Sequence, residues 1–269
     1  MAKMVKQFLL FLCYLAIAVF ALFPLLWGLK LSFTPRYDYG LIPDSLTLKH
    51  YQDILGKREI ITYFFNSVKV SIGAIVLAMP LALFAAYALA RFKFKGRNLL
   101  GMSLLILPML PSTAILVPLV SYFNKLGLYN SLWGVVIVSM VFNLPLAIWM
   151  LRNFIINTPK TIEEAALIDG LNSYQTLFKV TLPMIRPGMV SVIIYIFITS
   201  WNNYTFSYAL TTSQNKRVLS QALLAFLGSW GTNWGGLTAM GVIMVLPPIL
   251  LFLAFQDTFI AGMFGESLK

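Results

Sequence analysis

The segment EEAALIDG at positions 163–170 combines acidic and small side chains in a pattern that suits binding to another protein. It contains Glu163, Glu164 and Asp169, three of the nine acidic residues in the chain. Carboxylates form charge-assisted pairs with Arg or Lys of a partner, and the adjacent Ala165 and Ala166 let a partner come close. The chemistry that this segment suggests is therefore docking rather than catalysis.

Local signals predict that this segment is a short helix. Thr161 and Glu164 have the spacing of a capping box, and Gly170 suits the left-handed residue that ends a helix, which gives a helix of about nine residues. A second short helix is expected to begin at Asn172 and to stop at Pro183. Neighbours three and four apart share a helix face. The candidate docking face of the first helix carries Ile162, Ala165, Ala166 and Asp169.

An interfacial helix that rests on lipid headgroups is the alternative interpretation of this segment. Such helices favour basic side chains on their polar face, whereas residues 163–170 carry only acidic charge. Docking to a basic partner is therefore the preferred interpretation.

The sequence offers few groups for other kinds of chemistry. It has one histidine, His50, and one cysteine, Cys13, so neither a metal cluster nor a disulfide framework is expected. It also lacks the G-x-x-x-x-G-K-[ST] loop that binds ATP phosphates. We expect no catalytic residue, no metal and no cofactor in this chain, so the energy for any uphill transport must come from a partner.

The composition is that of a membrane protein. The chain has 269 residues, of which 59% are hydrophobic and 11% charged. A helix that crosses a bilayer needs about 20 apolar residues. The first such run is longer than a signal-peptide core and no cleavage site follows it, so we interpret it as an uncleaved span. The expected all-α fold is a single transmembrane domain over 1–269 with six helices, at 8–29, 67–90, 99–122, 131–151, 188–210 and 238–256.

The distribution of basic residues predicts the orientation. The link ARFKFKGRN at 90–98 carries four Lys or Arg residues and no acid, whereas the link after the third span has only Lys125. The positive-inside rule places 91–98 in the cytoplasm. Six spans then put both termini and the long link 152–187 on the cytoplasmic side of the inner membrane.

The charges argue against two further classes of protein, ion-driven carriers and nucleic-acid-binding proteins. No Asp or Glu lies inside the six expected spans, whereas ion-driven carriers usually need an ionisable group there. A self-contained secondary carrier stays open as an alternative because backbone carbonyls can hold sodium. The net charge of +11 is spread over both faces, which argues against a nucleic-acid partner and fits contact with anionic lipid on the cytoplasmic side.

The segment EAALIDGLNSYQTLFKVTLPMIRPG resembles the EAA signature of ABC-importer permeases, which reads E-A-A, three residues, Gly, nine residues and Ile-x-Leu-Pro. Val180 replaces the usual Ile. Other segments are similar to the maltose-permease-like branch of carbohydrate importers, and together they cover nearly the whole chain. These segments are YALARFKFKGRN, LRNF, TSWNNY, GTNWGGLTAM and GMFGESLK.

This resemblance implies a type I ABC importer permease fold with a cytoplasmic coupling helix between spans four and five. In that family, two permease subunits form the pore, an extracytoplasmic binding protein delivers the sugar, and two cytoplasmic ATPase subunits bind ATP and magnesium. Each ATPase receives one EAA helix in a cleft. Glu164 is then expected to pair with a basic residue of the ATPase, and Gly170 to shape the loop after the helix. The implied coupling residues are Glu163, Glu164, Ala165, Ala166, Asp169 and Gly170.

Amides and aromatic rings inside the membrane are candidates for a sugar pathway. Sugar hydroxyls need hydrogen bonds and sugar rings stack on aromatic faces, whereas polar groups in lipid are costly unless they face protein or water. The alternative is that these groups only bond neighbouring helices. The candidate pathway residues are Asn143, Tyr195, Asn202, Asn203 and Tyr204.

The link 211–236 between spans five and six is long for a hairpin. Tryptophans near a span end ordinarily anchor a helix at the membrane interface. The resemblance suggests instead a loop that reaches the binding protein, with Gly231, Thr232, Asn233 and Trp234 as contact residues.

The sequence therefore predicts a permease subunit of an ATP-driven importer for a di- or oligosaccharide. A permease of another ABC import branch, for amino acids or phosphate, is the main alternative. Neither the sugar nor the identity of the companion permease follows from the sequence.

Overall fold

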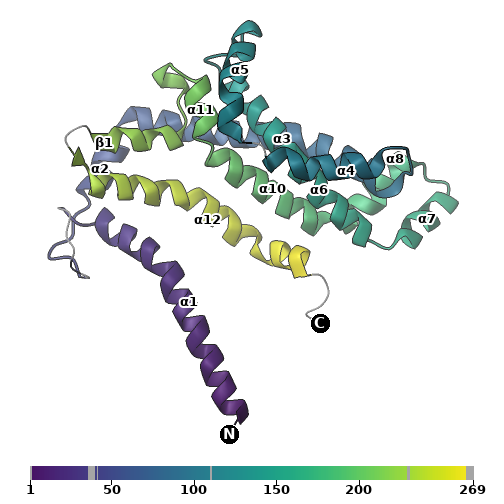
Figure 1. The fold of residues 1–269 in the computed structure, drawn as a ribbon, viewed down its shortest axis with the longest axis horizontal. Coiled ribbons are helices and arrows are strands. Elements are labelled where there is room, and N and C mark those ends of the chain that lie inside the picture. The colour runs from purple at the N-terminus through teal and green to yellow at the C-terminus, as the bar shows by residue number, and fades with distance from the viewer. Residues whose placement is uncertain (1, 36–39, 41, 110, 229–230, 265–269) are drawn as a thin grey trace. The chain divides into compact units, whose positions relative to one another are not determined.

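The computed structural model describes residues 2–35, 40, 42–109, 111–228 and 231–264, and helices dominate it (Figure 1). The chain divides into two compact units. Unit 1 comprises Met1–Ile61 and Ala222–Leu246, and unit 2 comprises Thr62–Gln221 and Pro247–Lys269. Both units contain parts of α3 and α12, so the division does not follow the ends of the helices.

Long apolar helices are the main elements, as the sequence predicts. One segment in each of α1, α3, α6 and α12 is long and apolar enough to cross a bilayer. A fifth crossing arises if the helical segments on either side of an 80° bend, Ser173–Met184 and Arg186–Trp201, count as one span. The described residues thus provide four to five apolar spans. The four helices are α1 (Ala2–Ser32), α3 (Arg58–Arg91), α6 (Leu132–Asn157) and α12 (Trp234–Phe264).

The third expected span, 99–122, is not a continuous helix. The chain forms α4 (Arg97–Ile106), the short 3-10 helix η1 (Leu107–Met109) and α5 (Ser112–Lys125). Pro108 and Pro111 flank the break, and a proline removes the backbone N–H that a continuous α-helix needs. Leu110, within this expected span, lies outside the described residues.

The fifth expected span, 188–210, is also interrupted. Helix α10 (Arg186–Trp201) ends before α11 (Thr205–Leu210) begins. The side-chain oxygen of Asn203 accepts a hydrogen bond from the backbone N–H of Phe206 at 3.2 Å. This local bond offers the backbone an alternative to continuing the helix.

The second short helix ends at Met184, one residue after the predicted stop at Pro183. From α8 (Ser173–Thr176), the chain continues through the π-helix η2 (Leu177–Thr181) into α9 (Leu182–Met184). Pro183 lies in the first turn of α9, where a proline is tolerated. The 80° bend follows α9, between Met184 and Arg186.

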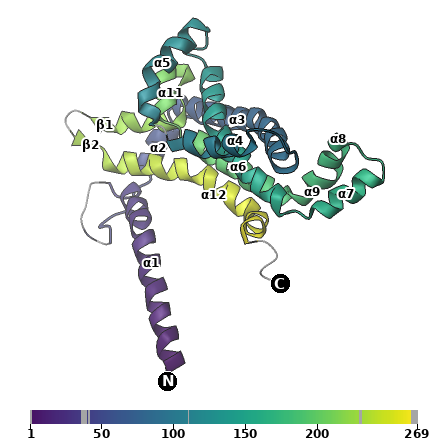
Figure 2. The same cartoon turned by 45° about the vertical axis from the view of Figure 1, so that its right-hand side comes forward.

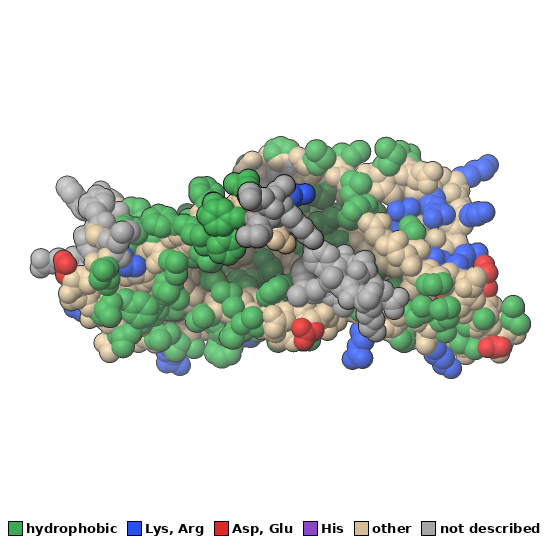
Figure 3. Space-filling view, turned by 90° about the horizontal axis from the view of Figure 1, so that it is seen from below, with side chains coloured by type: hydrophobic (Ala, Val, Ile, Leu, Met, Phe, Trp, Pro, Cys, Tyr) green, Lys and Arg blue, Asp and Glu red, His purple; other side chains and the backbone are tan. Residues whose placement is uncertain are grey.

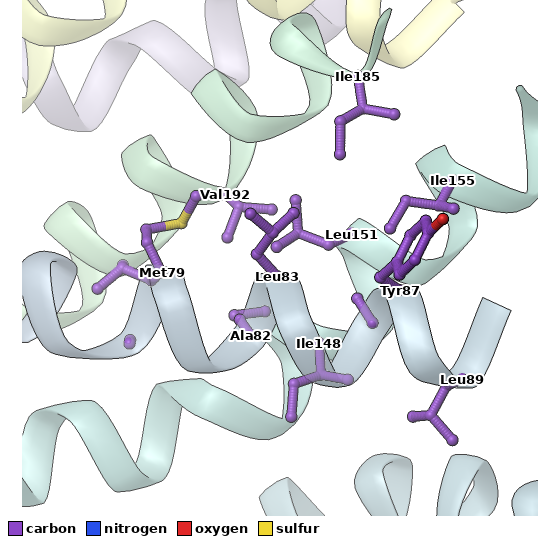
Figure 4. Packing of buried hydrophobic residues seen from close by; sticks show 14 of the residues in the cluster. Met79, Ala82, Leu83, Tyr87, Leu89, Ile148, Leu151, Ile155, Ile185 and Val192 are labelled. Atoms are coloured by element: carbon purple, nitrogen blue, oxygen red, sulfur yellow. The ribbon is translucent and has the colours of Figure 1, made fainter. Parts of the chain in front are cut away.

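A hydrophobic core within unit 2 holds α3, α6 and α10 together (Figure 4). Four alanines on α3 are fully buried at intervals of four residues, and this spacing gives one smooth face along the helix. Larger side chains such as Leu151 of α6 and Val192 of α10 pack at the same core. The four alanines are Ala74, Ala78, Ala82 and Ala86.

Unit 1 joins the end of α1 to α2 (Lys49–Leu55) and to a small hairpin. A ring nitrogen of His50 lies 3.0 Å from the carbonyl oxygen of Thr34. A Cβ atom at Gly235 would lie 2.2 Å from the His50 ring, so only glycine fits there. The hairpin pairs β1 (Leu227–Gly228) with β2 (Gly231–Thr232) in antiparallel register.

Between α11 and β1, the chain forms two 3-10 helices, η3 (Gln214–Lys216) and η4 (Leu219–Phe226). Within unit 2, the side-chain amide of Asn66 donates to the carbonyl oxygens of Asn215 and Arg217 at 2.9 and 2.8 Å. These bonds tie the start of this link to α3.

Candidate functional site

The acidic segment forms helix α7 (Lys160–Ile168), which has nine residues as the sequence predicts. Figure 2 shows α7, α8 and α9 beyond the end of α6. The predicted capping box is wrong: α7 begins two residues earlier, after Pro159, and no side chain caps its first turn. Proline before the helix restricts the entry of the chain, so Thr161 lies inside the first turn rather than before it.

The end of α7 agrees with the prediction. Gly170 has a φ of 91°, which is the left-handed conformation expected after a helix. The backbone N–H groups of Gly170 and Leu171 donate to the carbonyls of Leu167 and Ala166, both at 3.1 Å, and form a Schellman motif. The predicted cap at Asn172 is also confirmed, because Asn172 and Gln175 form a complete capping box.

Helix α7 has an exposed face and a buried face. Ile162 and Ile168 are 45% and 86% exposed, and Glu164, Ala165 and Asp169 are exposed as well. Glu163 and Ala166, three residues apart, are buried against the chain itself. Of the residues predicted to couple this chain to an ATPase, these two are therefore buried against the rest of unit 2, and the others are exposed.

The carboxylate of Glu163 is held inside the protein by Arg91, the last residue of α3. Nε and Nη2 of Arg91 each donate to one carboxylate oxygen at 2.8 Å, in a bidentate pair. The hydroxyl of Thr181 in η2 donates to the same carboxylate at 3.0 Å. Arg91 also donates to the carbonyl oxygen of Thr158, just after α6, at 3.2 Å. This single cluster, which we call the Arg91 cluster, therefore joins α3, α6, α7 and η2.

Glu164 has a different environment from Glu163. It pairs with Lys160 on the same helix at 2.7 Å, and the two side chains are 51% and 63% exposed. An exposed pair of this kind contributes about 0.3–0.5 kcal/mol. Because so little is lost when the pair separates, Glu164 is available to bind another basic group.

Charged side chains gather around α7 and α8. In Figure 3, basic and acidic side chains lie together at the end of unit 2 that carries these helices. The exposed basic residues of the links that follow α3 and α6 are Lys93, Lys95, Lys160, Lys179 and Arg186.

A second candidate site is an open hollow of about 280 Å³ within unit 2, at the break between α10 and α11. It brings together four of the five predicted pathway residues: Asn143, Asn202, Asn203 and Tyr204. Tyr195 is not among the residues that line it and packs instead against the hydrophobic core. The hollow also has wall residues outside this set of five, namely Ser139, Phe142, Thr199, Thr205 and Phe206.

The predicted pathway residues divide into two groups. Asn143 is 5% exposed; its amide donates to the carbonyl of Ser139 at 2.7 Å, and its oxygen accepts from the Thr199 hydroxyl at 2.6 Å. Asn203 donates to the Ser139 hydroxyl at 3.2 Å. These two amides bond neighbouring helices. The Asn202 side chain is exposed and makes no hydrogen bond to any described residue.

Tyr204 adds an aromatic surface beside this free amide. Its side chain is 37% exposed, and its ring stacks on Tyr208 with centroids 5.4 Å apart. The hollow therefore offers an amide and a tyrosine ring to a ligand, which suits a polyhydroxylated molecule.

The predicted contact residues 231–234 lie at the hairpin and the start of α12. Gly231 and Trp234 are exposed, whereas Asn233 has a structural role. The Asn233 side-chain oxygen accepts a hydrogen bond from Gly236 N–H at 3.0 Å, which caps α12. Thr232 pairs with Leu227 across the hairpin.

Sequence analysis missed the partner of Glu163. Arg91 was identified only as a marker of orientation and Thr181 only as part of the motif. The available signal was the three-residue spacing of Glu163 and Ala166, which places both on one face of the helix.

Comparisons with known proteins agree with this geometry. Residues 78–265 match the family model described as "Binding-protein-dependent transport system inner membrane component". The diacetylchitobiose uptake system permease protein NgcG of Streptomyces coelicolor is 35% identical over 245 residues, which are 89% of this chain and 81% of the relative. The arabinooligosaccharides transport system permease protein AraQ of Halalkalibacterium halodurans is 33% identical over 267 residues, which are 96% and 95% of the two chains.

The fold also matches a solved transporter. A chain in the crystal structure of a bacterial ABC transporter involved in the import of the acidic polysaccharide alginate superposes with a TM-score of 0.79 at 21% identity, covering 96% of this chain and 98% of that one. The apolar helices, the exposed helix α7 and these matches agree: the chain belongs to the family of inner membrane components of binding-protein-dependent transport systems, the ABC transporter permeases.

Proposed function

We propose that this chain is the permease subunit of an ATP-driven importer for a di- or oligosaccharide. The observation that carries the proposal is α7, a short helix anchored through Glu163 with Glu164 exposed on its outer face. The sugar class is supported by the relatives, whose names specify diacetylchitobiose and arabinooligosaccharides. It is also supported by the polar hollow beside Asn202 and Tyr204.

In this proposal, α7 enters a cleft of a cytoplasmic ATPase. Glu164 exchanges its exposed pair with Lys160 for a basic residue of the ATPase, and Ala165, Asp169 and Gly170 complete the contact surface. Glu163 and Ala166 serve from the inner face by holding the helix on unit 2. The ATPase binds ATP and magnesium, so this chain needs no cofactor of its own.

We propose six membrane crossings with both termini in the cytoplasm of an inner-membrane protein. The sixth crossing comes from α4 and α5, which together span 97–125 and break at two prolines. Broken helices are tolerated at membrane depth where they face protein or a cavity. The basic links after α3 and α6 then lie on the cytoplasmic side, as the positive-inside rule requires.

The extracytoplasmic side follows from the same orientation. The hairpin of β1 and β2 contacts a sugar-binding protein through Gly231, Thr232 and Trp234, while Asn233 fixes the start of α12. A second permease subunit supplies the other half of the pore. The hollow beside Asn202 forms part of the sugar path, and the companion subunit contributes the facing wall.

A purification from the native membrane followed by reconstitution tests the proposal. The tagged chain should co-purify with an ATPase and a second permease. Proteoliposomes that contain this complex should take up a labelled oligosaccharide only when ATP and the binding protein are both supplied. Uptake by the chain alone, driven by a proton or sodium gradient, would instead identify a secondary carrier.

A further inference from the structure

We propose that the Arg91 cluster is the mechanical link that passes movement of α7 to the helices around the hollow, with Arg91 and Glu163 as positioning residues. The inference rests on the proposed docking of α7 to an ATPase and adds the route by which the movement reaches the membrane. It assigns different tasks to two adjacent acids: Glu164 binds the ATPase, and Glu163 connects the helix to the rest of the permease.

The geometry of the pair supports a stiff connection. Arg91 and Glu163 make two parallel hydrogen bonds of 2.8 Å each, and a bidentate guanidinium–carboxylate pair fixes orientation as well as distance. The side chains are 10% and 5% exposed. The hydroxyl of Thr181 also donates to this carboxylate at 3.0 Å, so the carboxylate cannot turn away without breaking several bonds.

Burial is the reason why this pair resists separation. When one partner of a buried ion pair leaves, the other remains as an uncompensated charge, which is strongly unfavourable. The exposed pair of Lys160 and Glu164 carries no such penalty, because water solvates both groups when they part. A force applied to the outer face of α7 is therefore expected to move α3 with it before it breaks the Arg91 cluster.

The far end of the route is the hollow. Arg91 is the last residue of α3, and the alanine face of α3 shares one core with α6 and α10. Asn143 of α6 and Thr199 of α10, which bond each other at 2.6 Å, lie in the wall of the hollow. A displacement of α3 thus reaches both wall helices through continuous packing, and packed interfaces transmit strain because interiors have low compressibility.

The test uses the complete importer in proteoliposomes and measures the number of ATP molecules hydrolysed per sugar imported. Arg91→Glu and Glu163→Arg should each raise this ratio about tenfold or more, within the usual range of coupling between sites, while the ATPase stays attached. The double variant Arg91→Glu/Glu163→Arg restores opposite charges and should recover most of the coupling. Glu163→Gln keeps the shape and one accepting oxygen, but it loses the charge and one of the two hydrogen bonds from Arg91, so it should have an intermediate effect.

A matched control separates this role from the charge of the link as a whole. Lys93 lies two residues after Arg91 and is exposed, so Lys93→Gln removes a basic charge from the same link without touching the cluster. It should leave the ratio of ATP to sugar unchanged. A higher ratio of ATP to sugar in single variants that assemble and melt like the unmodified complex is the readout that a merely structural role of either residue would not produce.

A second arm applies if the single variants fail to assemble. Arg91→Cys/Glu163→Cys in a Cys13→Ala background can be joined by a bis-maleimide cross-linker, and the cross-linked complex should couple better than the untreated one. Equal coupling before and after cross-linking, or single variants that assemble and couple normally, would overturn the inference. If the unmodified chain binds no ATPase at all, the proposed function fails instead, so the two failures are distinguishable.

Discussion

Asn143 and Asn202 line the same hollow, but of their two side chains only that of Asn143 is hydrogen-bonded to other described residues. Asn143 is 5% exposed and exchanges hydrogen bonds with Ser139 and Thr199, whereas the Asn202 side chain is exposed. Two amides that look equivalent in the sequence therefore have separable roles, one in helix packing and one facing the hollow.

We expect Asn202→Ala to lower sugar uptake or to change sugar selectivity while the complex assembles normally. Asn143→Ala should lower stability by about 1–3 kcal/mol, because the Thr199 hydroxyl and nearby groups lose their partner in a buried site. Thermal melts of the purified complex and uptake of several labelled sugars distinguish the two effects. Normal uptake of every sugar by Asn202→Ala would remove this residue from the pathway.

Attachment of the ATPase is expected to depend more on the charge of the side chain at position 164 than on its shape. Loss of a charge-assisted bond to the ATPase should weaken attachment about tenfold or more in Glu164→Ala. Glu164→Lys should be worse, because it places like charges together, and Glu164→Gln should be mildest. The fraction of ATPase that co-purifies in detergent gives the order. Full transport by Glu164→Lys would show that α7 is not the coupling helix.

The junction between the hairpin and α12 offers variants at two adjacent positions. Trp234→Ala should reduce the stimulation of ATP hydrolysis by the binding protein without affecting ATPase attachment. Asn233→Ala should cost about 1 kcal/mol of stability through loss of the α12 cap, and Asn233→Ser should largely preserve the cap. Stimulation assays and melting curves provide the readouts. Unchanged stimulation in Trp234→Ala would argue against a contact at this residue.

Topology can be checked with two exposed lysines. Gly96 and Gly127 are unsuitable sites for cysteine because their φ angles are 86° and 70°, which strains any residue with a Cβ atom. Lys95→Cys and Lys125→Cys, each in a Cys13→Ala background, avoid that strain. An impermeant maleimide added to intact cells should label the cysteine at 125 and not the one at 95. Labelling of both from outside would contradict the six crossings.

Packing between α6 and α10 depends on Gly188. A Cβ atom there would lie 2.3 Å from the ring of Phe154, so Gly188→Ala should destabilise the protein by about 1–3 kcal/mol through overpacking. Phe154→Leu replaces the ring with a smaller side chain, so the double variant Gly188→Ala/Phe154→Leu should recover part of this loss. Melting temperatures of the two single variants and the double variant give the coupling, and simple additivity would refute the contact.

The apolar runs were sufficient to predict the four longest helices, because α1, α3, α6 and α12 each follow a continuous stretch of the sequence. The interruptions were harder to predict. Pro108 and Pro111 were visible breakers, but the break after Trp201 depends on a side-chain bond from Asn203 that forms only once the chain has turned. Composition alone does not indicate where an apolar run changes direction.

Helix α7 was predicted from its capping signals and motif, and its inner face was not. Glu163 and Glu164 are chemically identical, so the difference between them comes from the helix phase that is set by the packing of Ala166. The partner of Glu163 lies at the end of a distant helix, and no local pattern indicates such a contact. The first turn was predicted wrongly because Pro159, rather than Thr161, precedes the helix.

The π-helix η2 has a consequence for protein engineering. A π turn contains one more residue than an α turn, so deleting one residue from Leu177–Thr181 would restore α geometry. Because the extra residue is accommodated within that turn, the later side chains would keep their phase, whereas a second deletion would rotate every later side chain by about 100° relative to the preceding helix. After the second deletion, Thr181 would leave Glu163, and Ile185 would leave the core. A chimaera that exchanges docking helices between transporters should therefore transfer residues 158–185 as one cassette of fixed length, together with the arginine at position 91.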